Sequence, residues 1–482
     1  MLAYANNFDQ IRTLKVFGLH PKDSPKGLYE MTPEGPYRYF VRADTLHAPI
    51  YPSSDLLFKA VQVATMAAFR DSDGRMDIKI AALPVLLAWL ACIWLIFRKL
   101  LAKPLAALGF AGWILLVADP INLLFLNTWY AEFSAFALST VFVGIAWLWL
   151  FQLIALRKAL LWGGICIAVL SLNRNQYMFM LPAVAALVGA ALASSHSLRV
   201  PSPAAAAKWA LFAAACLLPP LVYTVTAKKS SEFFVWAATN RTNTVFGALL
   251  PASKDPANML KHMGLSPEGC AGFMGTNLYT QPLEKFEAGC PKSLKLGLGR
   301  IAKGVAGEPT VLVTIIHNIA LHQDGFLQHH IGHIEGERQA YIDDASESKF
   351  DGIRFRTSPA RAGSGSHQPL YRQSVDPLIR SLSTSATVLL IWFAALGPAL
   401  AALAALAVKQ GRWAFIFLLS GLLFNYALFS SILGDGYFEL ERHAILCFSF
   451  GALFFVLLGS WAVCILSARP ASGKGSPDSH TA

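Results

Sequence analysis

A polar segment of ten residues, Gly434–His443, separates two long apolar runs near the end of the chain. Its sequence is GDGYFELERH, and its ionisable side chains are Asp435, Glu439, Glu441, Arg442 and His443. The flanking runs, Trp413–Leu433 and Ala444–Ser467, contain no charged residue, and each is long enough to cross a bilayer, which takes about 20 residues as a helix. Charged groups at a membrane edge are costly to bury and usually mark a functional site. The alternative interpretation is a solvated acidic loop.

Further polar clusters recur between the apolar runs. They are Asn7 and Asp9 in NNFD, Asp119, Tyr130 and Glu132 in NTWYAE, Arg174 in NRNQ, and Arg241 in NRTN. A carboxylate can accept the proton of a hydroxyl group, and Arg or protonated His can neutralise a departing phosphate. These side chains therefore suit group transfer from a lipid-linked phosphate ester, whose phosphate lies at the membrane surface.

Several of these residues also have an interpretation without chemistry. Asp9 can be a solvated loop carboxylate. Glu132 can stabilise the start of a helix through the helix dipole. Arg174 can extend toward lipid headgroups along its aliphatic stem. Arg442 and His443 have the stronger claim to a function, because both lie next to a spanning run.

The composition is that of a membrane protein. The chain has 482 residues, of which 55% are hydrophobic and 14% are charged, and its mean hydropathy is +0.47. A formal net charge of +11 could suggest a nucleic-acid binder. The basic residues, however, lie mainly in short links between apolar runs, as expected for cytoplasmic loops, so nucleic acid is not a predicted partner.

Nine apolar runs predict an all-α polytopic membrane protein. The runs are Ile80–Phe97, Pro104–Ala118, Phe133–Leu156, Ala159–Asn173, Tyr177–Ser195, Trp209–Ala227, Ser381–Val408, Trp413–Leu433 and Ala444–Ser467. The basic links are 98–103, 157–158, 199–208, 409–412 and the C-terminal tail. The links 119–132 and 434–443 are acidic. By the positive-inside rule, the C-terminus is cytoplasmic and the polar clusters face outward.

This topology divides the chain into five parts. They are an outer loop over 1–79 with an interfacial helix at Leu56–Phe69, a first bundle segment over 80–227, an outer mixed domain over 228–380, a second bundle segment over 381–468 and a cytoplasmic tail over 469–482. Because Met1–Ala5 looks like the end of a membrane helix, we expect one more helix upstream of this sequence. The runs 104–118 and 159–173 are too short to cross alone as straight helices.

The seven cysteines fall into two groups. Five lie in apolar runs and act there as small hydrophobic residues, namely Cys92, Cys166, Cys216, Cys447 and Cys464. Cys270 and Cys290 lie in the outer domain, where an oxidising compartment favours a disulfide over the alternative of two free thiols. Such a bond stabilises a fold by about 3 kcal/mol in the chain-entropy account.

Five histidines gather in the outer domain. They are His317, His322, His329, His330 and His333. Their spacing matches no standard zinc signature, so we predict no metal site among them. The sequence contains no motif that indicates a cofactor. Whether the protein uses a divalent metal ion is left open.

The order of the motifs resembles that of one protein family. The motifs ANNFDQIR, LNTWYAEFSA, NTVFGALLPASKDP with HMGL, MGTNLY, HIGHIEGE and GDGYFELERHAIL occur between about Leu2 and Ser467. In this order the chain looks like the bacterial glycan-biosynthesis hexose transferases of the WsfD type, which are similar to GT-C membrane glycosyltransferases. The resemblance implies a GT-C-like multi-helix fold, an active site on the outer face and a polyprenyl-phosphate sugar as donor. This sequence differs from the family pattern in one respect, because the first helix of the family is missing from it.

The resemblance also implies roles for individual residues. Asp9 would be the catalytic base, and Glu132 a second acid near the reaction centre. Arg442 and His443 would face the donor phosphate. Arg174 is a third candidate for binding the donor phosphate, and the other site candidates are Asn7, Tyr130, Asp435 and Glu441.

The predicted reaction is inverting transfer of a hexose to a cell-surface glycan or glycolipid, at the outer face of the bacterial inner membrane. A transporter or flippase for a lipid-linked glycan is an alternative. It would need a polar path through the bilayer centre, and no internal repeat is visible. A glycan polymerase or ligase with a diphosphate-linked donor is another alternative, although two phosphates would favour more arginines near the site.

Overall fold

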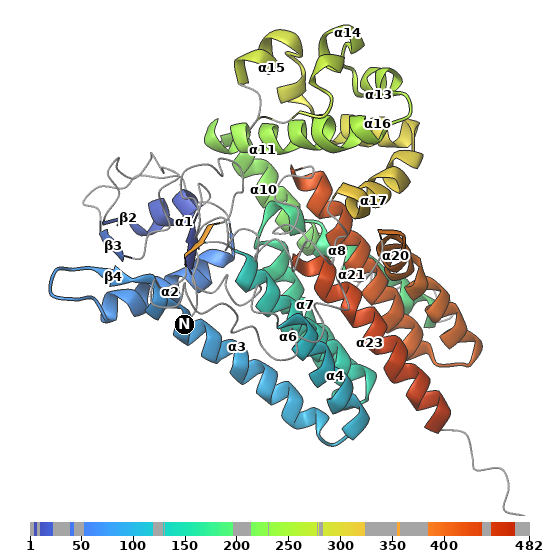
Figure 1. The fold of residues 1–482 in the computed structure, drawn as a ribbon. Coiled ribbons are helices and arrows are strands. Elements are labelled where there is room, and N and C mark those ends of the chain that lie inside the picture. Colours follow the sequence, from blue (N-terminus) through green and yellow to red (C-terminus); the bar gives the residue numbers. More distant parts are fainter. Residues whose placement is uncertain are drawn as a thin grey trace, which may run out of the picture.

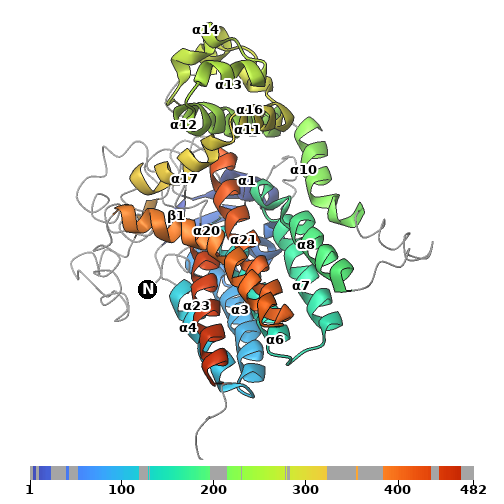
Figure 2. The same ribbon diagram turned by 90° about the vertical axis from the view of Figure 1, so that its right-hand side faces the viewer.

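The structure is a computed structural model, and it describes the chain in thirteen stretches. They are 4–6, 10–22, 39–42, 53–118, 129, 131–195, 214–229, 231–276, 278, 283–322, 354–356, 384–435 and 445–467. Helices dominate these stretches, and they form a bundle with a smaller helical unit beyond one end (Figures 1 and 2).

Six stretches of helix in the described part of the chain are long and apolar enough to cross a membrane. They are α3 (Ile78–Leu100), α6 (Glu132–Leu150), η2 (Asn175–Tyr177) with α8 (Met180–Ser195), α20 (Thr384–Ala407), α21 (Gly411–Asp435) and α23 (Ile445–Ser467). The chain is therefore a multi-pass membrane protein by length and composition of its helices. The other three predicted runs contain the shorter helices α4 (Pro104–Val117), α7 (Leu156–Ser171) and α10 (Leu218–Lys229), so nine spans stay a prediction.

Tryptophan side chains join the helices of the bundle. The indole N–H groups of Trp113 and Trp147 donate to the carbonyl groups of Ser449 and Ala106, at 2.9 and 3.1 Å. Away from water such polar groups need partners within the protein, so each bond fixes one helix against another. Gly144 lets α3 approach α6, because a Cβ at this position would lie only 2.6 Å from the Ile96 side chain.

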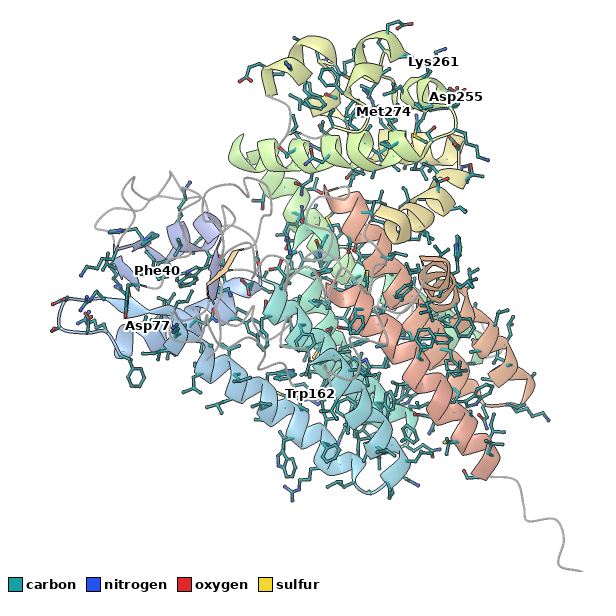
Figure 3. The ribbon with its side chains drawn as sticks, viewed as in Figure 1. Phe40, Asp77, Trp162, Asp255, Lys261 and Met274 are labelled. Atoms are coloured by element: carbon teal, nitrogen blue, oxygen red, sulfur yellow. A yellow bond between two sulfur atoms is a disulfide. The ribbon has the colours of Figure 1, made fainter. Side chains whose placement is uncertain are left out.

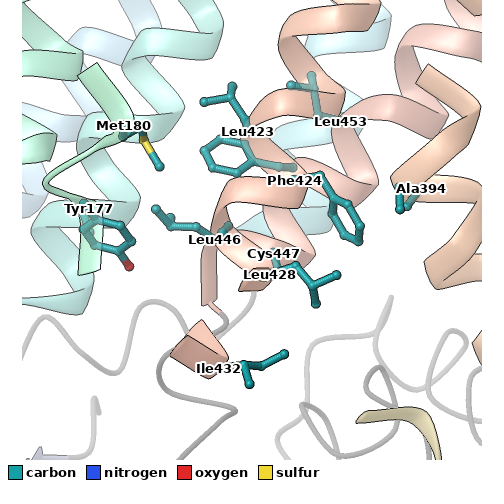
Figure 4. Close-up of a cluster of buried hydrophobic side chains, with 14 of the residues drawn as sticks. Tyr177, Met180, Ala394, Leu423, Phe424, Leu428, Ile432, Leu446, Cys447 and Leu453 are labelled. Atoms are coloured by element: carbon teal, nitrogen blue, oxygen red, sulfur yellow. The ribbon is translucent and has the colours of Figure 1, made fainter. Parts of the chain in front are cut away.

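Apolar side chains of α21 and α23 fill the other half of the bundle. Figure 4 shows Leu423, Phe424, Leu428 and Ile432 of α21 with Leu446, Cys447 and Leu453 of α23. All seven are at most 4% exposed. This core extends to the last turns of α21, so it holds the start of the acidic segment in place.

The two ends of the bundle differ. The links α3–α4, α6–α7 and α20–α21 lie at one end in Figures 1 and 2, and they carry the basic residues Lys103, Arg157 and Lys409. Helices α1, α2 and α11–α16 lie beyond the other end, which we call the polar end. This arrangement agrees with the predicted separation of basic links from polar clusters.

A small antiparallel sheet supports the polar end. Strands β2 (Leu19–Pro21), β3 (Tyr39–Arg42) and β4 (Met76–Asp77) pair in that order, beside α1 (Gln10–Phe17) and α2 (Asp55–Ala68). Phe40 and Trp129 meet edge to face with their ring centroids 5.3 Å apart, within a core that includes Leu14 and Met66. Figure 3 shows Phe40 in strand β3 of this sheet and Asp77 where β4 passes into α3.

The expectation of a helix end at Met1–Ala5 is wrong for Tyr4 and Ala5. Strand β1 (Tyr4–Asn6) pairs antiparallel with β5 (Arg354–Arg356), so that Tyr4 faces Arg356. These residues are extended because their backbone groups find partners about 350 positions away, which local sequence does not reveal. The helix expected at Leu56–Phe69 is present as α2, and its location at a membrane interface stays a prediction.

The described part of the predicted outer domain is helical except for β5. Its elements are α11 (Ser231–Asn243), the π-helical η3 (Thr244–Leu249), α12 (Leu250–Ala252), α13 (Pro256–Met263), α14 (Pro267–Cys270), η4 (Ala271–Phe273), α15 (Leu283–Gly289), η5 (Ser293–Lys295), α16 (Leu298–Gly307) and α17 (Thr310–His322). We call α12–α16, residues 250–307, the cap unit. Asp255 begins α13 by accepting a hydrogen bond from the Asn258 N–H, and Figure 3 shows it at the rim of the unit.

A disulfide and an aromatic cluster hold the cap unit together. Cys270 and Cys290 are bonded, with their Cα atoms 4.9 Å apart. Phe273 stacks on Phe286 at a centroid distance of 4.3 Å, and Phe246 meets Phe286 edge to face. The unit is small, so the covalent link supplements a limited apolar core.

Replacing both disulfide cysteines, in Cys270→Ser with Cys290→Ser, should lower the free energy of unfolding of the cap unit by about 3 kcal/mol, because the unfolded loop is no longer closed. Limited proteolysis across a temperature series measures this. Cys92→Ser, which removes an exposed free thiol in α3, is the matched control and should behave as wild type. Equal protease resistance of the double variant and wild type would contradict the prediction.

Candidate functional site

An ion pair joins two of the predicted site residues. Glu132 begins α6, and Arg174 lies directly before η2, where the chain turns from α7 into α8. Arg174 Nη1 contacts Glu132 Oε1. The Glu132 side chain is only 1% exposed, whereas that of Arg174 is 12% exposed. The structure thus brings the NTWYAE and NRNQ motifs together at the polar end, and the two charges neutralise each other.

A hydrogen-bonded chain next to this pair reaches α2. Asn173 Nδ2 donates to Ser134 Oγ at 2.7 Å, and Ser134 Oγ donates to Asp55 Oδ1 at 2.6 Å. Asp55, Ser134 and Asn173 are all buried. Residues far apart in sequence therefore form one polar core, and the sequence analysis did not single out Asp55.

Lys59 completes the set of buried charges. It lies one helical turn after Asp55 in α2, with Nζ 4.0 Å from Asp55 Oδ2, and is 2% exposed. Burial raises the pKa of Asp55, an effect that Lys59 opposes. Burial likewise lowers the pKa of Lys59, and Asp55 opposes that shift. Asp55, Lys59, Glu132 and Arg174 form a group of two acids and two bases, which we call the buried quartet.

Helix α2 buries polar side chains as far as Gln62 and the apolar Val63 and Met66 beyond it, while other apolar side chains point outward. Asp55, Lys59 and Gln62 are buried, whereas Leu57 and Val61 are 67% and 46% exposed. In a helix at an aqueous surface the pattern is the opposite. Contact of the outer face with lipid accounts for the inversion, and this agrees with the interfacial position that the sequence predicts.

Hydrogen bonds from Ser53 and Ser54 to backbone carbonyl groups fix the start of α2 against the end of α7. Ser53 Oγ donates to the Asn173 carbonyl at 2.5 Å, and Ser54 Oγ donates to the Val169 carbonyl at 2.6 Å. The Ser54 N–H donates to the Leu172 carbonyl, which also accepts from Tyr223 of α10. These bonds satisfy carbonyl groups at the end of α7 and place Asp55 beside Ser134.

Two motifs meet the end of α21, where the segment Gly434–His443 begins. Tyr426 donates its hydroxyl hydrogen to the Gln176 carbonyl at 2.9 Å. A Cβ at Gly434 would lie 3.9 Å from Gln176 Cβ. On the other side, Thr244 Oγ1 lies 3.0 Å from the Leu433 carbonyl oxygen. Gln176 of NRNQ and Thr244, the residue directly after NRTN, therefore lie beside consecutive residues of α21.

The remaining predicted site residues are not described by the structure. Asn7, Asp9, Asp119, Tyr130, Glu441, Arg442 and His443 lie outside the described residues, and so does the side chain of Asp435. The same holds for the side chains of the five clustered histidines. Among the residues that are described, no group of three or more His, Cys, Asp or Glu side chains could hold a metal ion.

One sequence signal could have indicated the missed residues. Asp55 and Lys59 are four positions apart in an otherwise apolar helix, a spacing at which opposite charges meet on one helical face. Ser134 and Asn173 carry no such signal, because their roles depend on contacts between separate helices.

Comparisons of the chain with protein-family models, with curated proteins and with solved structures found no match. The interpretation of the site therefore rests on its own residues and on the order of the sequence motifs.

Breaking the Asp55–Lys59 pair should be strongly destabilising. Asp55→Asn or Lys59→Met alone should lower the free energy of unfolding by about 3 kcal/mol, since each leaves a buried charge without its partner. The double variant should recover most of this loss, and a double-mutant cycle in thermal unfolding measures the coupling.

The matched control is Asp71→Asn. Asp71 forms an ion pair with Arg75 at the same i, i+4 spacing, but both side chains are more than a third exposed, so no measurable change is expected. Additive losses in the double variant of Asp55 and Lys59 would show that the two residues are not coupled.

Proposed function

We propose that this chain is a GT-C-type membrane glycosyltransferase that transfers a hexose from a polyprenyl-phosphate donor to a cell-surface glycan or glycolipid. The observation that carries the proposal is the gathering of acids and arginines at one end of a multi-pass bundle, around Glu132 and Arg174. A lipid-linked phosphate ester would place its phosphate at this level, with its hydrocarbon tail in the bilayer. The motif order in the sequence supports the same assignment.

In the proposed reaction, the bond between hexose C1 and the phosphate oxygen breaks, and its electron pair leaves with polyprenyl phosphate. The acceptor oxygen forms a new bond to C1 from the opposite face, which inverts the configuration. The proton of the acceptor hydroxyl passes to a carboxylate, for which Asp9 is our candidate. Arg442 and His443 would stabilise the charge that develops on the phosphate.

Glu132 and Arg174 act as a pair in this scheme. Glu132 is buried and paired with Arg174. It is therefore better placed to orient the Arg174 guanidinium than to remove a proton from a substrate. Arg174 retains a partly exposed side chain that can reach the polar end. We therefore propose Glu132 as a positioning residue.

The distribution of charge weighs against transport. Within the described residues of the six candidate spans, the Asp, Glu, Lys and Arg residues are Lys79, Arg98, Lys99, Glu132, Arg412 and Asp435. All lie within three positions of a helix end. A transporter moving a charged glycan lipid would need polar groups near the bilayer centre.

The assay uses purified protein, a labelled polyprenyl-monophosphate hexose and a membrane glycan extract. Asp9→Asn should reduce release of polyprenyl phosphate about 100-fold or more, since loss of a general base typically has an effect of 10²–10⁴. Glu132→Gln should reduce release less and should weaken donor binding. Asp73→Asn makes the same chemical change at an exposed turn and should leave the rate unchanged.

Equal release from wild type and Asp9→Asn would remove Asp9 as the base. Absence of release from wild type with several monophosphate donors, but turnover of diphosphate-linked donors, would replace the proposal by a polymerase or ligase. No turnover of either donor class would favour transport.

A further inference from the structure

Arg241 lies in the last turn of α11, a helix that packs against α21. It is three residues before Thr244, whose hydroxyl lies 3.0 Å from the Leu433 carbonyl oxygen. Arg241 is therefore about one helical turn away from a direct contact with the end of α21. The π-helical η3 follows at once, and such segments occur often at functional sites.

Arg241 differs from Arg174 in having no partner in the described part of the chain. Its Nε atom is buried and makes no hydrogen bond there, and no ion pair of Arg241 with a described carboxylate is present. Burial alone lowers the pKa of Arg241, which is the direction expected when no acid compensates. The adjacent Thr242 is fully buried, and its hydroxyl also makes no hydrogen bond there.

Arg241 is partly buried, with its Nε atom enclosed. A partly buried arginine without a counter-charge is unfavourable, and an anionic ligand would relieve this. The position narrows the class of anion. Leu433 and Gly434 are in the last turns of a spanning helix, so the side chain lies at the depth where a lipid carries its headgroup phosphate. The planar guanidinium can form paired hydrogen bonds with phosphate oxygens.

We propose that Arg241 binds the phosphate of a lipid-linked ligand. Arg241 supplies the unneutralised positive charge that Arg174, paired with Glu132, does not. The site deepens the proposed function and rests on it for the identity of the lipid. In that scheme Arg241 holds the phosphate, while the Glu132–Arg174 pair forms the opposite side of the same end of α21.

The test measures binding of four probes to the full chain in detergent micelles by native mass spectrometry. The probes are undecaprenyl phosphate, undecaprenyl diphosphate, undecaprenol and inorganic phosphate. Wild type should retain undecaprenyl phosphate at least about tenfold better than undecaprenol, and Arg241→Gln should abolish this preference. Inorganic phosphate should bind more weakly than undecaprenyl phosphate, because it lacks the lipid tail that contributes apolar burial. If inorganic phosphate and undecaprenyl phosphate bound with equal affinity, the ligand would be a soluble anion and the assignment would be overturned.

Two further variants keep the result interpretable. Arg241→Lys retains the charge without the planar fork and should show an intermediate preference. Arg300→Gln removes an exposed arginine from α16 of the cap unit and should bind as wild type. Arg241→Gln could keep the wild-type preference for undecaprenyl phosphate over undecaprenol and also have a lower melting temperature without ligand. This result would show that Arg241 pairs with a carboxylate of the chain, and it would overturn the proposal.

The same variants separate this site from the proposed activity. If Arg241→Gln loses phosphate preference but wild type transfers no hexose, the site stands and the transferase function fails. If wild type transfers hexose and Arg241→Gln matches it in both rate and phosphate preference, the function stands and the site fails.

Discussion

The constraint on which the polar end depends is the burial of four charges. Moving an ion out of water costs several kcal/mol, so buried ions persist only when they are paired and hydrogen-bonded. Here Asp55 and Lys59 come from α2, Glu132 from α6 and Arg174 from the start of η2. Helix α2 supplies both members of one ion pair, whereas Glu132 and Arg174 come from different elements and pair between them. Their relative positions are therefore set by electrostatics in addition to apolar packing, and Ser134 and Asn173 fix the geometry between them.

This constraint also explains the unusual orientation of α2. If its apolar face were turned inward, Asp55 and Lys59 would leave the quartet, and Glu132 and Arg174 would remain buried with less compensation. With the polar face inward, Leu57 and Val61 point away from the protein. Helix α3, which follows, likewise exposes Leu83, Leu87 and Leu90. A lipid environment around both helices reconciles the buried polar groups with the exposed apolar ones.

The sequence was sufficient for features encoded locally and insufficient for those that depend on distant contacts. Long apolar runs gave the position of α3, α6, α21 and α23, because a spanning helix satisfies its own backbone. Cys270 and Cys290 were recognisable as a pair by their shared polar setting. Strand β1 was misjudged as a helix end, since only pairing with β5 makes it extended. Asp55 was missed because its partner Ser134 is 79 positions away. The roles of Asp9, Arg442 and His443 stay predictions, since these residues lie outside the described part of the chain.

The two arginine motifs illustrate why composition alone cannot assign a binding residue. Arg174 and Arg241 both follow an asparagine, and their motifs meet neighbouring residues at the end of α21. In sequence they are equivalent candidates for an anion. Folding makes them different, because Glu132 neutralises Arg174 while Arg241 finds no acid in the described part of the chain. An arginine already paired with a carboxylate must exchange that partner before it can hold a phosphate, whereas an unneutralised one gains by binding. The difference favours a division of labour in which one arginine shapes the site and the other attracts the ligand.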